Sequence, residues 1–187
     1  MASVKAPMKW LILGADGQLG RAMQAELMNS GVDFLSRNHS QLDITNEDEI
    51  ARVFEEVQPD VVLNSAAWTD VDGAEAAEGT ARLINAYGPL LLAKACSTLK
   101  AKFVHISTDY VFSGNSMTPW QEDSVLGPIS AYGRTKAEGE SLVRDCYPHG
   151  TFVVRTAWLY SPWKKNFAKT MVRLALKETG SVKVVND

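Results

Sequence analysis

The sequence has few cysteines and histidines and lacks a long apolar run, and each shortage excludes a class of protein. Its 187 residues include only Cys96 and Cys146 as cysteines, too few for a disulfide framework and spaced unlike any metal motif. The three histidines are scattered without ligand spacing, so we expect no metal site. No apolar stretch approaches the roughly 20 residues that cross a bilayer, so we expect no membrane segment.

The sequence also lacks an excess of charge of either sign. Its formal net charge is -3, with acids and bases interspersed, which argues against a nucleic-acid partner. The apolar stretch Trp10–Leu13 runs straight into a glycine turn and makes a poor signal peptide, so we expect a cytoplasmic protein. We interpret residues 1–7 as a disordered leader or tag and residues 8–187 as one NAD(P)-binding domain of Rossmann type.

Short apolar runs alternate with helical patterns along the chain. Such alternation indicates an α/β fold with a parallel sheet, because a parallel connection needs a crossover. The strand cores are continuously apolar, as expected where helices cover both faces. We therefore predict a doubly wound sheet of about seven strands. The predicted strands are Lys9–Leu13, Val32–Ser36, Leu42–Thr45, Val61–Leu63, Phe103–Ser107, Phe152–Arg155 and Val182–Val185. The predicted helices are Gln18–Ser30, Asn46–Val57, Arg82–Leu99, Ala131–Cys146 and Phe167–Lys177.

A glycine pattern stands where such folds bind dinucleotides. Gly14, Gly17 and Gly20 follow the first strand and open the first helix with the spacing G-x-x-G-x-x-G. The first glycine permits a tight turn, the second a close approach of the backbone to a pyrophosphate, and the third close helix–strand packing. The N–H groups of the helix N-terminus would then face the phosphates. The pattern predicts a cofactor site, and the alternative is a turn without a ligand.

Three further segments are candidates for the same cofactor. Asp43 and Ile44 could meet the adenine, or Asp43 could be a solvated acid beside a buried strand. The small residues in Asn64-Ser65-Ala66-Ala67 would let a dinucleotide pass close over the sheet, or they simply pack tightly. No acid follows the second strand, which ends at Ser36-Arg37, so Arg37 could pair with a 2′-phosphate. We therefore expect NADPH, with NADH possible.

A hydroxyl, a tyrosine and a lysine follow in the order that reductase chemistry needs. Thr108 ends a strand, and Tyr132 and Lys136 lie four apart on the helix after a polar loop, so they share a helix face. The pKa of a phenol is about 10 in water, so a tyrosine is a poor acid–base catalyst at neutral pH. An adjacent cation would lower that pKa. The hydroxyl could polarise a carbonyl while the tyrosine donates a proton. A Y-x-x-x-K pair alone is more often a solvated helix face.

Six motifs together resemble the extended short-chain dehydrogenase/reductases, and among them the dTDP-4-dehydrorhamnose reductase family. They are GADGQLG, LDIT, NSAAWTDVDGAE, HISTDYVFSG, AYGRTKAEGE and VVRTAWLY, and they cover nearly the whole chain from Met8. STDYVF followed by YGRTK is quite specific to that family. The resemblance implies NAD(P)H-dependent reduction of the C4 ketone of a nucleotide-linked 6-deoxysugar, and a homodimer is possible.

The resemblance also assigns roles by position. It implies that Thr108 holds the carbonyl, Tyr132 donates the proton, and Lys136 binds the ribose and tunes the tyrosine. Asn85 would support the cofactor site, and the segment Arg155-Thr156-Ala157-Trp158 would run alongside the nicotinamide and the sugar. The expected substrate contacts are Thr108, Asp109, Val111 and Trp158. The expected cofactor contacts are Gly14, Asp16, Gly17, Gln18, Leu19, Gly20, Ser36, Arg37, Asp43, Ile44, Asn64, Ala66, Ala67, Thr69, Asn85, Tyr132 and Lys136.

One departure concerns length. The family continues for roughly another hundred residues, about one further folding unit, that build much of the sugar-nucleotide site. We therefore expect a C-terminally truncated chain, with the small substrate domain largely absent, that binds cofactor but turns substrate over poorly. Two other functions stay open: an epimerase or dehydratase of the same extended family, and a non-catalytic NADP-binding regulatory subunit like the β subunit of methionine adenosyltransferase.

Overall fold

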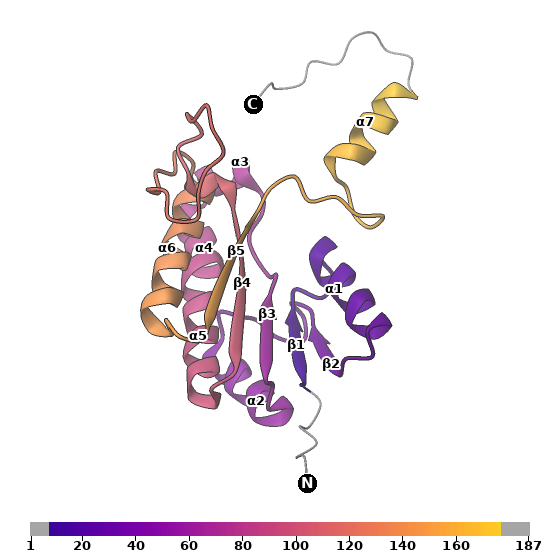
Figure 1. Ribbon diagram of the computed structural model, residues 1–187, viewed down its shortest axis with the longest axis vertical. Helices are drawn as coiled ribbons and strands as arrows, with labels where there is room; N and C mark the ends of the chain where they lie inside the picture. Colours follow the sequence, from indigo (N-terminus) through magenta and orange to yellow (C-terminus); the bar gives the residue numbers. More distant parts are fainter. Residues whose placement is uncertain (1–7, 177–187) are drawn as a thin grey trace.

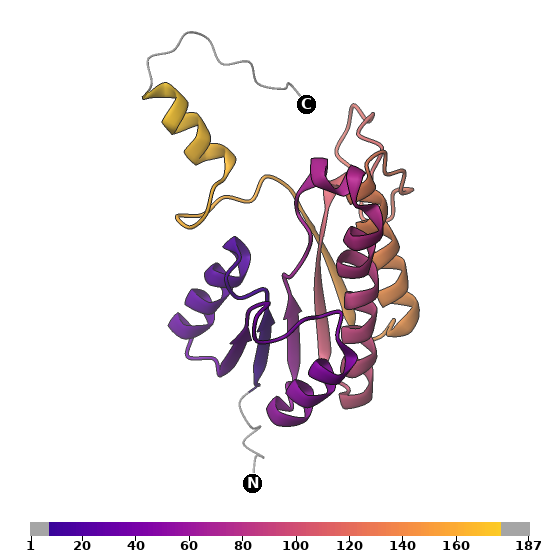
Figure 2. The same cartoon turned by 180° about the vertical axis from the view of Figure 1, so that it is seen from behind.

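The computed structural model describes residues 8–176, and these form a parallel sheet with helices on both faces (Figures 1 and 2). The sheet has five strands in the order β2-β1-β3-β4-β5, every neighbouring pair parallel. The bounds are β1 Trp10–Leu13, β2 Phe34–Arg37, β3 Val61–Asn64, β4 Lys102–Thr108 and β5 Thr151–Thr156. The chain runs outward from β1 to β2 and then crosses back to β3, so the reversal point of this doubly wound sheet lies between β1 and β3.

The helices divide between the two faces. In the figures α1 covers one face, whereas α2, α4, α5 and α6 cover the other (Figures 1 and 2). Helix α7 lies beyond the ends of the strands and buries none of its residues. The bounds are α1 Gln18–Asn29, α2 Glu47–Val57, α3 Val71–Ala76, α4 Glu78–Arg82, α5 Gly88–Leu99, α6 Ala131–Cys146 and α7 Phe167–Ala175, with a π-helical turn η1 Leu83–Tyr87 and a 3-10 turn η2 Asp109–Val111.

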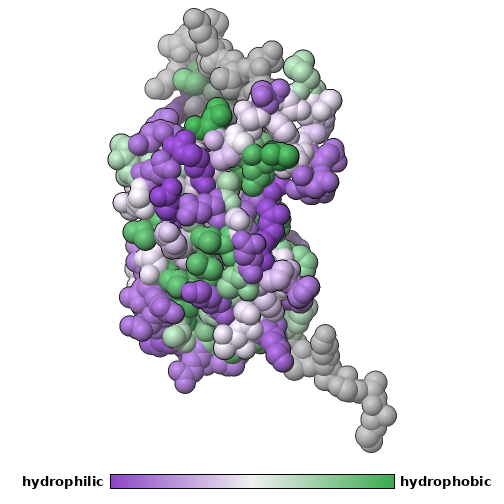
Figure 3. Space-filling model, turned by 90° about the vertical axis from the view of Figure 1, so that its left-hand side faces the viewer, coloured by the Kyte–Doolittle hydropathy of each residue, from purple (hydrophilic) through white to green (hydrophobic). Residues whose placement is uncertain are grey.

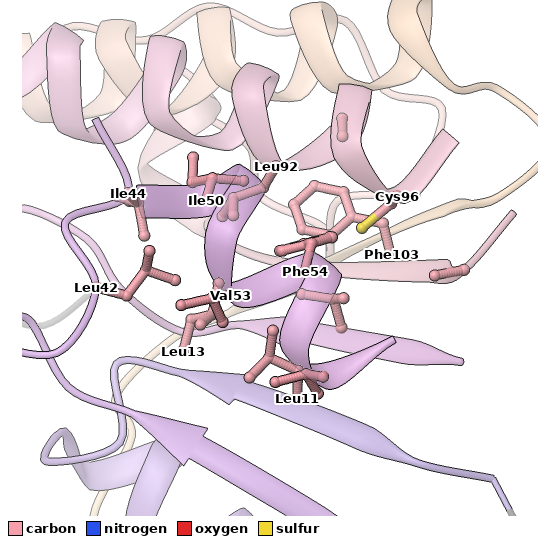
Figure 4. Packing of buried hydrophobic residues seen from close by; sticks show 14 of the residues in the cluster. Leu11, Leu13, Leu42, Ile44, Ile50, Val53, Phe54, Leu92, Cys96 and Phe103 are labelled. Atoms are coloured by element: carbon pink, nitrogen blue, oxygen red, sulfur yellow. The ribbon is translucent and has the colours of Figure 1, made fainter. Parts of the chain in front are cut away.

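The cores of β1 and β3 are buried on both sides, as predicted, whereas the edge strands β2 and β5 are not, since Leu35, Phe152 and Val154 are exposed. Leu11 and Leu13 of β1 pack into the larger core cluster beneath α2 and α5, with Phe54, Leu92 and Phe103 (Figure 4). Ile12 points to the other face and packs with Leu27 of α1 and Leu63 of β3. Cys96 is fully buried in the larger cluster, where burial raises the pKa of its thiol, and both cysteines are free. Cys96 is thus an inert packing residue, whereas Cys146 is only half-buried.

Two expectations about elements need comment. The predicted strand Leu42–Thr45 is wrong: Leu42 and Ile44 are buried in the core, but the segment is a loop, in which the Asp43 carboxylate accepts hydrogen bonds from the N–H (2.9 Å) and hydroxyl (2.8 Å) of Thr45. This local turn satisfies backbone groups that a strand would pair with a neighbour. The predicted strand Val182–Val185 and the leader Met1–Pro7 lie outside the described residues.

The boundaries of the remaining elements were predicted closely, except around α5. Helix α6 has the predicted bounds, and Asn46 caps α2 by accepting from the N–H groups of Asp48 and Glu49. The continuous helix predicted over Arg82–Leu99 is instead α4, the π-helical turn η1 and α5, and the short helix α3 was not foreseen.

The surface over α6 mixes hydrophilic residues with small hydrophobic groups (Figure 3). Among residues 8–176, no helix is both long enough and apolar enough to pass through a bilayer.

Candidate active site

The glycine loop after β1 has a backbone that only glycine adopts without strain. Gly14 has φ +77°, and a Cβ there would lie 2.6 Å from the backbone nitrogen of Ala66 and 2.7 Å from the carbonyl carbon of Ser65. A side chain would therefore force β1 and the segment after β3 apart. Gly14 thus lets the ends of β1 and β3 pack closely beside the reversal point of the sheet, which fixes where the glycine loop begins.

Helix α1 begins directly after this turn with an open N-terminus. Its cap residue, Gly17, offers no side chain to the first N–H groups, and no acid stands in the first turn. These donors and the helix dipole therefore face the cavity ready for an anion. Gln24 fixes the loop from behind, because its amide donates to the carbonyl of Ala15 at 2.8 Å and its oxygen accepts from the Ser36 hydroxyl at 2.9 Å.

Two strands further along the sheet, β4 ends in the predicted hydroxyl. Thr108 donates its hydroxyl proton to Asp109 Oδ1 at 2.9 Å and accepts from the N–H of Tyr110 at 3.2 Å, which caps η2. Tyr132, in the first turn of α6, lies with its ring edge-on to Tyr110 at 5.6 Å between centroids. Ser130 caps this helix by accepting from the N–H of Gly133. The fold thus brings strand-end hydroxyl and helix-borne phenol together, as the sequence predicted.

Lys136 is buried at the end of β4. Its Nζ donates to the carbonyl of Ile106 at 2.7 Å and lies 3.4 Å from Nε2 of His105. The other ring nitrogen of His105 is 3.3 Å from the amide nitrogen of Asn64, whose oxygen accepts from the N–H of Ala66. The amide nitrogen of Asn64 thus donates to Nδ1 of His105, and Nε2 lies against the amino group of Lys136.

The two titratable groups on α6 both respond to burial. Burial lowers the pKa of Lys136 to about 8, while the carboxylate of Glu140 acts in the opposite direction. Burial raises the pKa of Tyr132, and the neighbouring Thr108 hydroxyl partly offsets it. The ammonium group of Lys136 is directed to the carbonyl of Ile106, and its role in lowering the pKa of Tyr132 stays a prediction. The phenol is protonated at neutral pH.

Asn85 connects the cofactor side of the site to α6. It is fully buried in η1; its oxygen accepts from the N–H of Trp68 at 2.9 Å and its nitrogen donates to the Trp68 carbonyl at 3.1 Å and to the Thr135 hydroxyl at 3.2 Å. It is therefore placed as a support for the loop after β3, and the structure does not bring it to the cavity surface.

A cavity of about 970 Å³ joins the glycine loop to the hydroxyl, tyrosine and lysine. Of the predicted residues, its wall contains Gly17, Gln18, Leu19, Ala67, Thr69, Thr108, Asp109, Tyr132, Lys136 and Trp158. Sequence reasoning missed Tyr110, Lys164 and Lys165 on this wall, which carry no motif signal of their own. Val111, expected to contact substrate, is instead fully buried.

The other predicted nucleotide contacts lie behind or beside the cavity wall. Asp16 accepts from the Asn38 amide at 2.9 Å, and Arg37 forms an ion pair with Glu56 of α2 at 3.3 Å. Asp43 is turned to Thr45, a contact that lowers the pKa of its carboxyl. Gly14, Gly20, Asn64 and Ala66 shape the wall from beneath. The roles of all these residues toward a cofactor stay predictions.

Arg155 does not face the cavity. Its guanidinium makes two contacts with the carboxylate of Glu140, at 2.9 and 2.6 Å, donates to the carbonyl of Glu122 at 3.0 Å, and lies 4.9 Å from the centroid of the Phe112 ring. It therefore anchors the loop between β4 and α6 to the helix that carries Tyr132.

Two features of the cavity fit a nicotinamide dinucleotide. One is the start of α1, where Gly17 lines the cavity without a side chain and leaves the backbone open to a ligand. The other is Ser107, a buried cavity residue whose hydroxyl finds no hydrogen-bond partner within residues 8–176. A buried hydroxyl without a partner is costly, and a polar group of a ligand would relieve it.

Comparison with known proteins places the chain in a family. A family model described as "RmlD substrate binding domain" matches residues 8–187. A "dTDP-4-keto-6-deoxy-D-glucose reductase" of Streptomyces niveus is 43% identical over 180 residues, covering 96% of this chain and 62% of the relative. A "dTDP-4-dehydrorhamnose reductase" of Streptomyces griseus is 41% identical over 179 residues, covering 96% and 59%.

Solved structures agree. A dTDP-4-dehydrorhamnose reductase from Bacillus anthracis, solved in complex with NADP, superposes with a TM-score of 0.88 at 39% identity, covering 92% of this chain and 61% of that one. One from Clostridium acetobutylicum gives 0.87 at 45% identity, covering 91% and 60%. The fold and site are those of a Rossmann-like α/β protein with a glycine loop and a Thr/Tyr/Lys set. The chain belongs to the RmlD substrate-binding-domain family and spans about three fifths of the length of these relatives.

Proposed function

We propose that this protein reduces the C4 ketone of a nucleotide-linked 6-deoxysugar, converting dTDP-4-dehydrorhamnose to dTDP-rhamnose with NADPH, in the cytoplasm. The observation that carries the proposal is the convergence of Thr108, Tyr132 and Lys136 on the cavity that begins at the glycine loop. The two similar reductases above support the substrate class, and the NADP complex of the Bacillus anthracis protein supports the cofactor.

In the proposed site the glycine loop and the N-terminus of α1 hold the pyrophosphate of the cofactor. The end of β4 lies two strand spacings, or about 10 Å, from β1, so Thr108, Tyr132 and Lys136 would hold the nicotinamide half. Bound NADPH would supply the hydride. We thus assign residues 8–187 to cofactor binding, although the family description speaks of substrate.

The chain's own residues carry the proton chemistry. Thr108, held by Asp109 and the N–H of Tyr110, orients the substrate carbonyl. Tyr132, protonated because its pKa is raised, donates the proton to the carbonyl oxygen. Lys136, buried beside His105 with its pKa lowered to about 8, lines the same cavity, and we assign it to the ribose of the cofactor, as the resemblance implies.

The test is NADPH oxidation with dTDP-4-dehydro-6-deoxy-L-mannose. We expect cofactor consumption that depends on the sugar, and in Tyr132→Phe a turnover lower by about two to four orders of magnitude with NADPH affinity nearly intact. A Tyr132→Phe variant that keeps most of its kcat would contradict the assignment. Isomerised or dehydrated sugar without net NADPH consumption would indicate an epimerase or dehydratase. NADPH binding without any turnover would favour a regulatory subunit. The homodimer stays a prediction for sedimentation analysis.

A further inference from the structure

Two lysines outside every recognised motif line the same cavity as the glycine loop. Lys164 and Lys165 lie in the segment between β5 and α7 and share the cavity wall with Gly17, Gln18 and Leu19. Both are exposed. Within residues 8–176, the side chains of both make no hydrogen bond and no ion pair to protein groups, so their charges are free to meet a ligand.

The segment is fixed to the start of α1. Asn166 donates from its amide nitrogen to Gln18 Oε1 at 3.1 Å and to the carbonyl of Ser161 at 2.8 Å, while its oxygen caps α7 by accepting from the N–H of Lys169. The Ser161 hydroxyl also lies 2.8 Å from Gln18 Oε1. Ser161 and Asn166, which flank Lys164 and Lys165 in the chain, are thus both tied to Gln18, the first residue of the helix whose N–H groups face the cavity.

The third lysine of the segment has a different task. The Nζ of Lys169 donates to the carbonyls of Pro162 and Lys164, which shapes the turn that presents the two free lysines. Lys164 itself adopts a left-handed backbone, with φ +59°. The ammonium group of Lys169 therefore stabilises the turn, whereas the side chains of Lys164 and Lys165 remain at the cavity.

The charge on the cavity wall has one predominant sign. The carboxylate and the ammonium groups on this wall belong to Asp109, Lys136, Lys164 and Lys165. Asp109 is already engaged with the Thr108 hydroxyl, and Lys136 donates to the carbonyl of Ile106. Lys164 and Lys165 are thus the cations that remain for an anion placed at the N-terminus of α1.

We propose that Lys164 and Lys165 bind a pyrophosphate in this cavity, clamping it against the N-terminus of α1. The inference rests on the proposed function, which supplies two ligands with this group: the dinucleotide cofactor and the nucleotide sugar. The ties from Ser161 and Asn166 to Gln18 favour the cofactor. A compact ammonium on a flexible stem suits a phosphate oxygen as a point charge.

Calorimetric titration tests the clamp, with NADPH and dTDP as separate probes. Lys164→Gln and Lys165→Gln should each weaken NADPH binding about two- to fivefold, as expected for exposed charge pairs, and the double variant about tenfold. The difference should shrink in about 0.5 M salt, which screens exposed charges. Lys94→Gln, on the exposed surface of α5, is the matched control that removes one charge away from the cavity.

A second variant separates charge from backbone effects. Lys164→Gly removes the cation and relieves the left-handed strain, so it should weaken binding without lowering the Tm. A loss of affinity confined to dTDP would support the clamp and assign its pyrophosphate to the nucleotide sugar. NADPH and dTDP affinities in the double variant equal to those of Lys94→Gln would overturn the proposal. A wild-type chain that binds neither probe would overturn the proposed function itself.

Discussion

Replacing Glu140 by glutamine should destabilise the protein more than any exposed charge change. Glu140 is a fully buried carboxylate on α6, two turns after Tyr132. It contacts Arg155 twice, at 2.9 and 2.6 Å, and Arg144 once, at 2.9 Å. The substitution keeps the volume of the side chain and removes its charge, so Arg155, whose side chain is only 16% exposed, loses its counter-ion.

The two arginines should differ in their contributions. Breaking a buried pair by removing one partner costs about 3 to 5 kcal/mol, because an uncompensated charge stays buried. Arg144 is 49% exposed, so its own pair with Glu140 contributes about 1 kcal/mol or less. We therefore expect a loss of about 3 kcal/mol for Glu140→Gln, or about 6 to 12 °C in Tm for a protein of this size, and under 1 kcal/mol for Arg144→Gln.

Urea unfolding of wild type and both variants measures these values, and limited proteolysis adds a local readout. Because Arg155 also holds the carbonyl of Glu122 and packs over Phe112, cleavage in the loop between β4 and α6 should be faster in Glu140→Gln. Equal effects of Glu140→Gln and Arg144→Gln, or a loss below about 1 kcal/mol for the buried carboxylate, would refute the reasoning.

Three further predictions concern the cofactor end of the site. Gly14→Ala should abolish measurable NADPH binding in calorimetry and lower the Tm, because the new Cβ would lie 2.6 Å from the nitrogen of Ala66; near wild-type affinity would show that the loop does not depend on this close packing. The pKa of Lys136 is lowered to about 8, so on raising the pH the folded state releases this proton before the unfolded state does. The unfolding free energy of the wild type should therefore rise, relative to that of Lys136→Met, by about 2 to 3 kcal/mol between about pH 7 and 10. A difference that stays constant with pH would show that this lysine is not desolvated. Arg37→Ala should reduce NADPH affinity and leave NADH affinity unchanged; an unaltered ratio would mean that the ion pair with Glu56 is its whole role.

The elements read most reliably from sequence were those whose local pattern and tertiary environment agree. Helix α6 has the predicted bounds, and Ser130 caps its first turn, although its buried face includes Thr135, Lys136 and Glu140. The segment Leu42–Thr45 carries buried apolar residues like those of a strand, but it is a loop. A strand forms only where a neighbouring strand pairs with it, and the local sequence does not reveal such a neighbour. The π-helical turn η1 was also invisible, because it follows from Asn85 reaching the backbone of Trp68.

In the candidate site, too, local patterns were predictable and long-range contacts were not. Glycine spacing and the Tyr132–Lys136 pair specify local geometry and were recognised, and the fold brings them to one cavity. Lys164 and Lys165 come to that cavity through the contacts of Ser161 and Asn166 with Gln18, more than 140 residues earlier in the chain. Such long-range contacts leave no periodicity or spacing to read.

The measurement that tests the proposed reduction most directly is the fate of a labelled hydride. The protein, in stoichiometric amount so that slow turnover suffices, would be mixed with NADPH carrying deuterium at the transferred position of the nicotinamide and with dTDP-4-dehydro-6-deoxy-L-mannose. We predict one deuterium at C4 of the sugar for each NADPH consumed, with a greatly reduced rate in Tyr132→Phe. Sugar that remains unlabelled, or labelled product formed equally fast by Tyr132→Phe, would contradict the account.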